Sequence, residues 1–273
     1  MVLAPLLVLL TVGSGAAADR RPSSREVLER AGRYVAACAD EFVHLVAQEV
    51  SEQELRPRPS VARVIQRRRL VADLGWVRLA GVHEAIGVRD VFEVDGRAVH
   101  GETTRRLLTL LHGQAHGTVA EAEALLDEST HYNLADSSRN INLPTFAFFL
   151  LHPGLQPRFS WKRREHTDEG IWVFSFKEKG RPTVVRTSQG KPVYSEGRVW
   201  IDARTGIVQR TRIELHFDRV EYRMEVAFEP VAAIGFTLPV RLHESYRTPS
   251  SDVEGTSTYS HYRRFTTEAR LVP

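Results

Sequence analysis

Histidine is the residue type of this chain with the widest chemical range, because imidazole binds metals and transfers protons near neutral pH. The chain has 11 histidines. His83 has no second histidine four residues on, so the zinc-protease pattern of two histidines on one helical face is absent. His112 and His116 have that spacing, but Gly113 and Gly117 disfavour a continuous helix there. The other histidines fall on different predicted elements, so we predict no metal site.

Motifs for nucleophilic or cofactor chemistry are also missing from the sequence. It has no Gly-x-Ser-x-Gly elbow, no phosphate-binding loop and no dinucleotide fingerprint. Serine, histidine and aspartate are too common here for a triad to be inferred. We therefore predict no catalytic residue and no cofactor, and an undetected hydrolase is the alternative.

Asp90 is a carboxylate with apolar neighbours. It lies in a predicted strand between Gly87 and Gly96, and alternation places it on one face with Val88, Phe92 and Val94. A buried carboxylate must find a partner or shift its pKa. An arginine partner is the structural interpretation, and a ligand-binding or catalytic role is the alternative.

The charge balance argues against a nucleic-acid partner. The 37 basic and 34 acidic residues leave a formal net charge of +3, which is a small bias. Aromatic residues do not interleave with basic ones in a stacking pattern. The triplet Arg67-Arg68-Arg69 either contacts an anionic headgroup or belongs to a solvated stretch of strand.

Residues 1–18 have the pattern of a secretory signal peptide. A short apolar run from Leu3 to Val12 is followed by small residues, which predicts cleavage after Ala18. The run is shorter than the roughly 20 residues of a spanning helix, and no later segment reaches that length. The mature chain is thus expected to be periplasmic or secreted, without a transmembrane segment. Cys38 is the single cysteine, and we expect a buried, inert thiol.

A second pattern, with a period of two, fills the stretch from Gly170 to Phe265. Ile213 and Leu215, for example, alternate with charged residues, which predicts antiparallel strands with one buried and one wet face. Trp200 to Gly206 is predicted to be a tight hairpin, with an aspartate accepting turn N–H groups and a glycine at positive φ. Further strands are expected from about 43 to 54 and from 61 to 79.

Helical patterns occupy the N-terminus and the middle of the chain. Ser23 and Glu26 form a capping box before a predicted helix over about 24–39. Helices are also expected over 101–111, after Thr118, and over 144–153. The last is apolar nearly all round, so it is either fully buried or plugs an apolar concavity. Together these patterns predict an α+β fold in which a strongly curved antiparallel sheet, an unclosed β-barrel, carries helices over its concave face.

This layout resembles the periplasmic lipoprotein-carrier superfamily of LolA, LolB and RseB-type proteins. Residues 200–206 (WIDARTG) are similar to the W-x-D-x-x-T-G hairpin common in that superfamily. The chain also resembles uncharacterised exported bacterial proteins that share the stretches 89–96 and 142–145. The resemblance covers about residues 24–265. It implies one domain over 19–273, with a helical insertion at about 98–157 and an apolar cavity for acyl chains. A lipoprotein-receiving cysteine of the LolB kind is missing, so no specific cargo is implied.

The functional prediction is a non-catalytic binding or carrier protein for lipid or lipoprotein acyl chains in the cell envelope. The alternatives are an envelope module of RseB type that binds a protein partner, and a hydrolase that uses Asp90 with a histidine. Helices and side chains could also fill the sheet completely. The predicted apolar lining comprises Phe92, Phe146, Phe148, Phe149, Trp172, Phe174, Phe176, Ile213, Leu215, Tyr222 and Met224.

Overall fold

The computed structural model describes residues 21–60, 62–78, 85–99, 106–107, 119–134, 141–166, 170–187 and 189–264. The predicted signal peptide and most of the predicted helix over 101–111 lie outside these residues. Among the described residues, no helix is long and apolar enough to cross a membrane.

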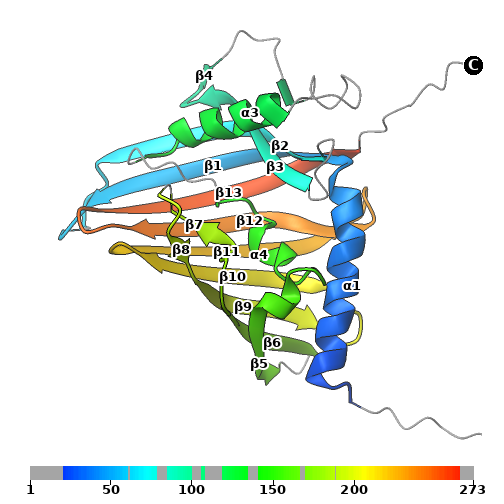
Figure 1. The fold of residues 1–273 in the computed structure, drawn as a ribbon. Helices are drawn as coiled ribbons and strands as arrows, with labels where there is room; N and C mark the ends of the chain where they lie inside the picture. The colour runs from blue at the N-terminus through cyan, green and yellow to red at the C-terminus, as the bar shows by residue number, and fades with distance from the viewer. Residues whose placement is uncertain are drawn as a thin grey trace, which may run out of the picture.

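One antiparallel sheet dominates the fold (Figure 1). Its strands are β1 (Leu45–Pro57), β2 (Gln66–Arg78), β3 (Ala85–Val94), β4 (Arg97–Ala98), β5 (Phe159–His166), β6 (Ile171–Glu178), β9 (Ser195–Asp202), β10 (Val208–Phe217), β11 (Val220–Val231), β12 (Phe236–Arg247) and β13 (Ser251–Arg264). Their order is β4-β3-β2-β1-β13-β12-β11-β10-β9-β6-β5. Because β4 and β5 are different ends of this order, the sheet is not closed. The predicted open antiparallel sheet is confirmed.

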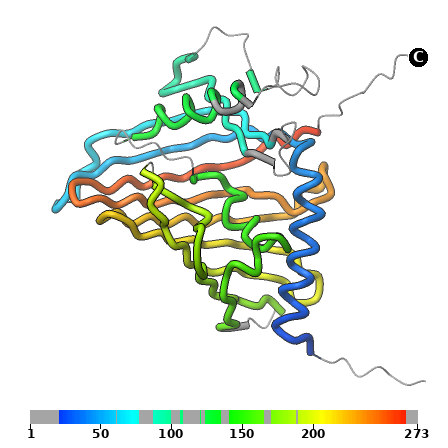
Figure 2. The backbone as a smooth tube through the Cα atoms, viewed as in Figure 1, coloured from blue at the N-terminus to red at the C-terminus, as the bar shows by residue number. Residues whose placement is uncertain are grey.

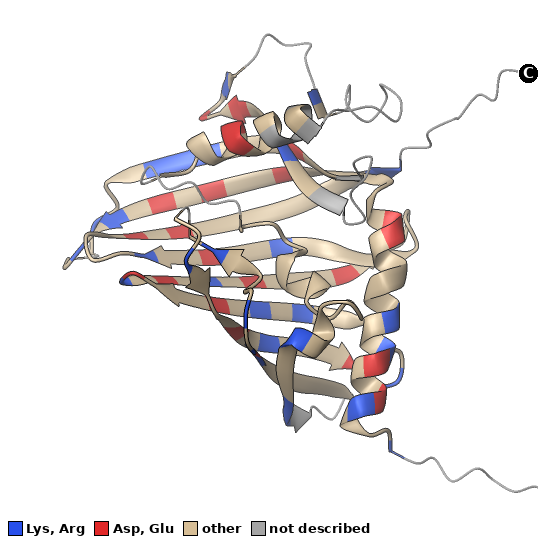
Figure 3. Ribbon diagram, in the orientation of Figure 1, with Lys and Arg blue, Asp and Glu red and all other residues tan. Residues whose placement is uncertain are grey.

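Water on one face explains why the strands alternate. In β10, Ile213 and Leu215 are fully buried, whereas Arg212 and Glu214, which alternate with them, are partly exposed and form ion pairs with β11. Bands of both charges lie along the strands in Figure 3. Such interspersed charge stabilises a wet sheet face only modestly, so the buried face is the main source of stability.

Two arginines of the triplet on β2 belong to this wet surface. Arg67 pairs with Glu54 at 3.0 Å and Arg69 with Glu93 at 2.6 Å. Arg68 lies on the other face, because side chains alternate along a strand, and it is partly buried and donates to the Tyr132 carbonyl at 2.8 Å. The interpretation as a solvated stretch of strand therefore fits Arg67 and Arg69, whereas Arg68 ties β2 to the end of the helix α3 (Val119–His131).

The helix α1 (Ser24–Phe42) begins with the predicted capping box. The Glu26 N–H donates to Ser23 Oγ at 3.2 Å, and the Ser23 N–H donates to the Glu26 carboxylate at 2.6 Å. The helix ends at Phe42, in agreement with a predicted end at about 39 or a little beyond. Its apolar stripe lies in the core with the sheet and includes Cys38, which is buried as predicted. Burial raises the pKa of this thiol to about 11.

The hairpin after β9 docks onto α1. The N–H groups of Arg204 and Thr205 both donate to Asp202 Oδ1 at 2.8 Å, and Gly206 has φ +81°, as the hairpin prediction requires. The guanidinium of Arg30 on α1 donates to the Ala203 carbonyl at 2.7 Å. A Cβ on Gly206 would lie 2.6 Å from the Arg30 carbonyl carbon. The hairpin thus fixes the register of β9 and β10 and also positions α1 on the sheet.

This contact predicts that Gly206→Ala lowers the free energy of unfolding by about 3 kcal/mol, because strain at positive φ adds to a clash with helix backbone. Gly235→Ala is the matched control, since Gly235 has φ +82° but open space around its Cβ position. That variant should lose only about 1–2 kcal/mol. Urea denaturation of both variants measures the difference, and equal losses would mean that α1 shifts freely at the hairpin.

The structure corrects the prediction of which side chains share a face of β3, because the pairing of β2 with β3 contains a bulge. Register shifts between Val71 and Ala72, so that Ala72 lies opposite Val91 and Leu70 lies opposite Val94. Val91 and Val94 pack in one cluster. The single face predicted for Val88, Asp90, Phe92 and Val94 was wrong, because the extra residue of a bulge reverses the alternation beyond it.

Two other predicted elements are shorter than expected. The strand expected over 61–79 begins only at Gln66. The helix expected over 144–153 is the single turn α4 (Phe146–Phe149), flanked by turns. Thr145 does not cap α4, because its hydroxyl accepts a hydrogen bond from the Trp76 indole instead. The helix α3 (Val119–His131) lies where a helix after Thr118 was expected, and it contacts β3.

Candidate apolar ligand-binding site

Two segments cross the face of the sheet on which α1 packs. The first is residues 141–158, which contains α4. The second, here called the strap, is residues 179–187 and 189–194 between β6 and β9, with the short strands β7 (Val185–Arg186) and β8 (Pro192–Val193). Figure 2 shows both segments in front of the sheet, on the side of α1. Ala147, Phe148, Val185 and Val193 join them to the main core cluster.

A pocket of about 410 Å³ lies between these two segments and the β2–β3 end of the sheet. Its volume is within the range of small-molecule sites, roughly 300–1,000 Å³. Most of its lining residues are apolar, and Thr145 and Arg186 are the polar ones. The lining consists of Trp76, Gly87, Leu126, Ile141, Leu143, Thr145, Phe146, Phe149, Leu150, Leu155, Val184, Val185 and Arg186.

Several of these apolar side chains are only partly buried. Ile141, Leu143, Phe146, Phe149 and Val184 pack against the core but keep part of their surface exposed. Exposed apolar surface gathered in a concave place is typical of a binding site. A ligand that fills the pocket would remove this surface from water.

The predicted lining divides between the pocket and the core. Phe146 and Phe149 line the pocket. Phe92 is half-buried on β3. The others pack in the main core: Phe148, Trp172, Phe174, Phe176, Ile213, Leu215, Tyr222 and Met224. Side chains therefore fill the space over β6 and β9–β11, and the pocket lies nearer to β2 and β3.

A buried ion pair holds the first segment at the pocket. The Arg89 guanidinium donates to both carboxylate oxygens of Glu49 and, at 3.1 Å each, to the side-chain and main-chain oxygens of Asn142. Arg89 and Glu49 are 7% and 1% exposed, so their attraction is little screened by water. The Trp76 indole adds a hydrogen bond of 3.0 Å to Thr145. Residues 142 and 145 are thus fixed to the sheet beside the pocket.

The ion pair continues into a polar track across the buried sheet face. The Tyr259 hydroxyl donates to Glu49 at 3.1 Å, and the Tyr222 hydroxyl donates to Glu244 at 3.2 Å. The Glu244 side chain has room because its neighbour on β13 is Gly255, which has no Cβ. A Cβ at that position would lie 2.8 Å from the Glu244 side chain. Burial raises the pKa of the Tyr259 phenol well above its ordinary value.

A second buried carboxylate, Glu178 at the end of β6, holds the strap. One of its oxygens accepts the Val184 N–H at 2.7 Å. The other accepts the N–H and the hydroxyl of Ser195, at 3.2 and 2.9 Å. Arg158 lies 3.8 Å from the same carboxylate. One side chain therefore fixes the strap at Val184 and at its junction with β9, which positions Val184 at the pocket.

Asp90 lies outside this pocket. It is 1% exposed, and its carboxylate accepts the Leu107 N–H at 2.9 Å and contacts the Arg106 guanidinium at 3.4 Å. Arg106 also pairs with Glu128 of α3 at 2.5 Å. These contacts tie β3 to α3, in agreement with the structural interpretation of an arginine partner.

A larger hollow of about 560 Å³ lies at the docking hairpin. Its lining mixes apolar residues with Asp202, Arg210 and Glu229. Burying an apolar chain there would desolvate charged groups without compensation. The smaller pocket suits an apolar ligand better.

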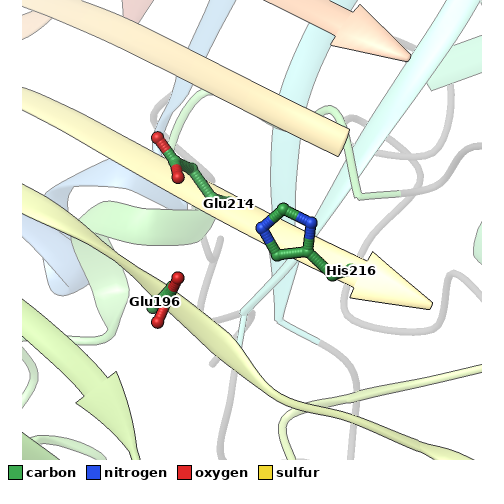
Figure 4. Close-up of side chains that lie close together, drawn as sticks. All are labelled: Glu196, Glu214 and His216. Carbon is green, nitrogen blue, oxygen red and sulfur yellow. The ribbon is translucent and has the colours of Figure 1, made fainter. Parts of the chain in front are cut away.

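Three possible metal ligands gather on the wet face of the sheet. Glu196 lies opposite Glu214, and His216 follows two residues later on the same face, with ligand atoms within 4.8 Å of one another (Figure 4). Each carboxylate already has a cation: Lys177 is 3.2 Å from Glu196, and Arg223 is 3.1 Å from Glu214. This arrangement is that of a solvated charge network.

Comparisons with known proteins find structural likeness only. No family model matches the sequence, and no curated protein matches it. Similar solved structures include a putative outer membrane lipoprotein-sorting protein domain from Vibrio parahaemolyticus, with a TM-score of 0.45 and 10% identity over 92% of this chain and 95% of that one. They also include a DUF1329 family protein from Desulfovibrio piger, with a TM-score of 0.37 and 11% identity over 90% and 95%.

The LolA-like architecture predicted from the sequence is supported by the order of elements in the structure itself. An N-terminal helix packs on an open antiparallel sheet, and α3 and α4 come between β4 and β5. The class of protein is thus an open-sheet fold with an apolar pocket on its helix-bearing face.

Proposed function

We propose that this protein binds one acyl chain in the pocket framed by residues 141–155 and the strap, as an exported, non-catalytic carrier in the cell envelope. The observation that supports the proposal is the apolar pocket of about 410 Å³ with partly exposed walls. In this proposal α1, α4 and the strap cover the concave face of the sheet, and export follows cleavage of residues 1–18.

The size of the pocket fits a single chain. If a methylene needs about the liquid volume of one water, roughly 30 Å³, the pocket holds about a dozen methylenes. Burying them would contribute roughly 0.8 kcal/mol each, or about 10 kcal/mol before ordering costs. After a cost of about 4 kcal/mol for association and ordering, about 6 kcal/mol remains, which corresponds to a dissociation constant of tens of micromolar.

Filling the pocket should abolish binding. Val184→Trp places an indole in the pocket while leaving the backbone bond to Glu178 intact, and we expect dodecanol and dodecanoate to bind at least tenfold more weakly to it than to the wild type. Calorimetric titration below the micelle concentration measures this.

Val231→Trp is the matched control, because Val231 is also partly buried against the core but does not line the pocket. It should bind like the wild type. A wild-type protein that binds neither compound, and carries no lipid in native mass spectra, would refute the acyl-carrier function and favour a module that binds a protein partner.

A further inference from the structure

Arg186 is the charged residue in the lining of the apolar pocket. It is an exposed residue on β7, in the strap, which Glu178 holds at Val184 and at Ser195. Among the described residues, no acidic side chain forms an ion pair with it, whereas Arg67 and Arg69 of β2 and Arg89 of β3 each have such a partner. The guanidinium is therefore available at the edge of the pocket.

A cation at the rim of an apolar pocket changes which ligand fits best. A guanidinium presents a planar set of N–H donors that match carboxylate and phosphate oxygens. A wholly neutral chain would fill the pocket without using this group. A chain with an anionic end would bury its tail among the apolar side chains and keep its charge at the rim, beside Arg186.

We infer that the ligand of this pocket is a single-chain amphiphile with an anionic headgroup, a carboxylate or a phosphate, which Arg186 binds. The inference rests on the proposed acyl-chain function and adds the headgroup class to it. Arg186 is a specificity residue in this scheme, and the apolar walls supply most of the affinity.

Four probes separate tail from headgroup: dodecanoate, dodecyl phosphate, dodecanol and inorganic phosphate. At low ionic strength the wild-type protein should bind dodecanoate or dodecyl phosphate about fivefold more tightly than dodecanol, as expected for a partly exposed ion pair. The difference should shrink in about 1 M salt, where the screening length is only about 3 Å. Inorganic phosphate should not bind measurably. The tighter of the two anionic probes identifies the fatty-acid or phosphate-ester source.

Arg186→Gln should remove the difference, so that all three chain compounds bind like dodecanol. Arg181→Gln is the matched control, because Arg181 is exposed on the same strap but does not line the pocket. It should keep the wild-type preference.

The outcomes separate the two proposals. Equal binding of the three chain compounds to the wild type, or a preference that survives Arg186→Gln, overturns the headgroup inference and leaves the acyl-chain function standing. Failure of all three to bind overturns both. Inorganic phosphate binding as tightly as dodecyl phosphate would also overturn the inference, since the tail would then contribute nothing.

Discussion

Replacing Arg89 by leucine is expected to lower the free energy of unfolding by about 3–5 kcal/mol, because the buried Glu49 carboxylate loses its charged partner. Glu49 is 1% exposed and would keep only the Tyr259 hydroxyl among the contacts described above. Asn142 would lose both hydrogen bonds from the guanidinium. Urea denaturation measures the loss.

A surface ion pair between β2 and β3, in the same part of the sheet, is the control. Arg69 and Glu93 pair across β2 and β3 at 2.6 Å, but they are 46% and 33% exposed. Arg69→Leu should therefore cost less than about 1 kcal/mol. A loss of that size for Arg89→Leu as well would mean that water reaches the Glu49 carboxylate.

The double variant Arg89→Leu/Glu49→Leu tests whether the ion pair stabilises the fold or only positions Asn142 beside the pocket. Two apolar side chains of similar size can replace a buried ion pair at little cost. We expect the double variant to recover much of the stability but not the hydrogen bonds to Asn142. Its binding of dodecanoate should stay weakened, because Asn142 would no longer be held to the sheet beside the pocket, although Thr145 would keep its bond to Trp76.

The parts of the fold that could be predicted from sequence are those that meet water on one side. β10 and β11 alternate because their outer faces carry ion pairs such as Arg212–Glu225. β3 is different, since Val88 and Asp90 are buried on one side and Arg89 and Val91 on the other. Burial on both faces removes the alternation, and a bulge reverses what remains. The pattern therefore identified a strand there but not its faces.

Some features of the pocket could likewise be predicted from sequence and others could not. The apolar run at 144–153 indicated where a lid would lie, and Phe146 and Phe149 do line the pocket. Its supports could not be predicted, because Arg89 finds Glu49 only through the register of three strands. Glu178 looks in sequence like the last polar residue of an alternating strand. Its role as the anchor of the strap depends on the tertiary fold, which brings Val184 and Ser195 to the Glu178 carboxylate.

The second prediction with a large expected effect is a steep loss of stability in alkali. Tyr259 is 4% exposed and donates to Glu49, and Tyr262 donates to the Pro239 carbonyl. Desolvation by burial raises the pKa of both phenols above the ordinary value of 10.0. Above pH 10 the unfolded chain loses these two protons and the folded chain keeps them, so the unfolded state binds fewer protons and stability falls as pH rises.

The expected slope is about 1.4 kcal/mol per pH unit for each tyrosine, or about 5 kcal/mol for the pair between pH 10 and pH 12. Cys38 adds to this slope between its ordinary pKa of 9.0 and about 11, so the measurement belongs in a Cys38→Ala background. The chain has only 4 lysines, which limits other titrations in this range.

Urea denaturation at pH 8 to 12 measures the slope, and phenolate absorbance shows when the tyrosines ionise. In Tyr259→Phe/Tyr262→Phe the slope should fall by the share of these two phenols, about 2.7 kcal/mol per pH unit. A smaller slope should remain, because burial also raises the pKa of Tyr34 above its ordinary value and that of Tyr132 to about 12. The chain has 7 tyrosines, so the signal of Tyr259 and Tyr262 is the part of the phenolate absorbance that the double variant loses, and in the parent this part should appear together with unfolding. Ionisation of Tyr259 in protein that stays folded would instead mean that the polar track opens to water without unfolding. The ion pair of Arg89 would then be a gate to the pocket rather than a fixed support.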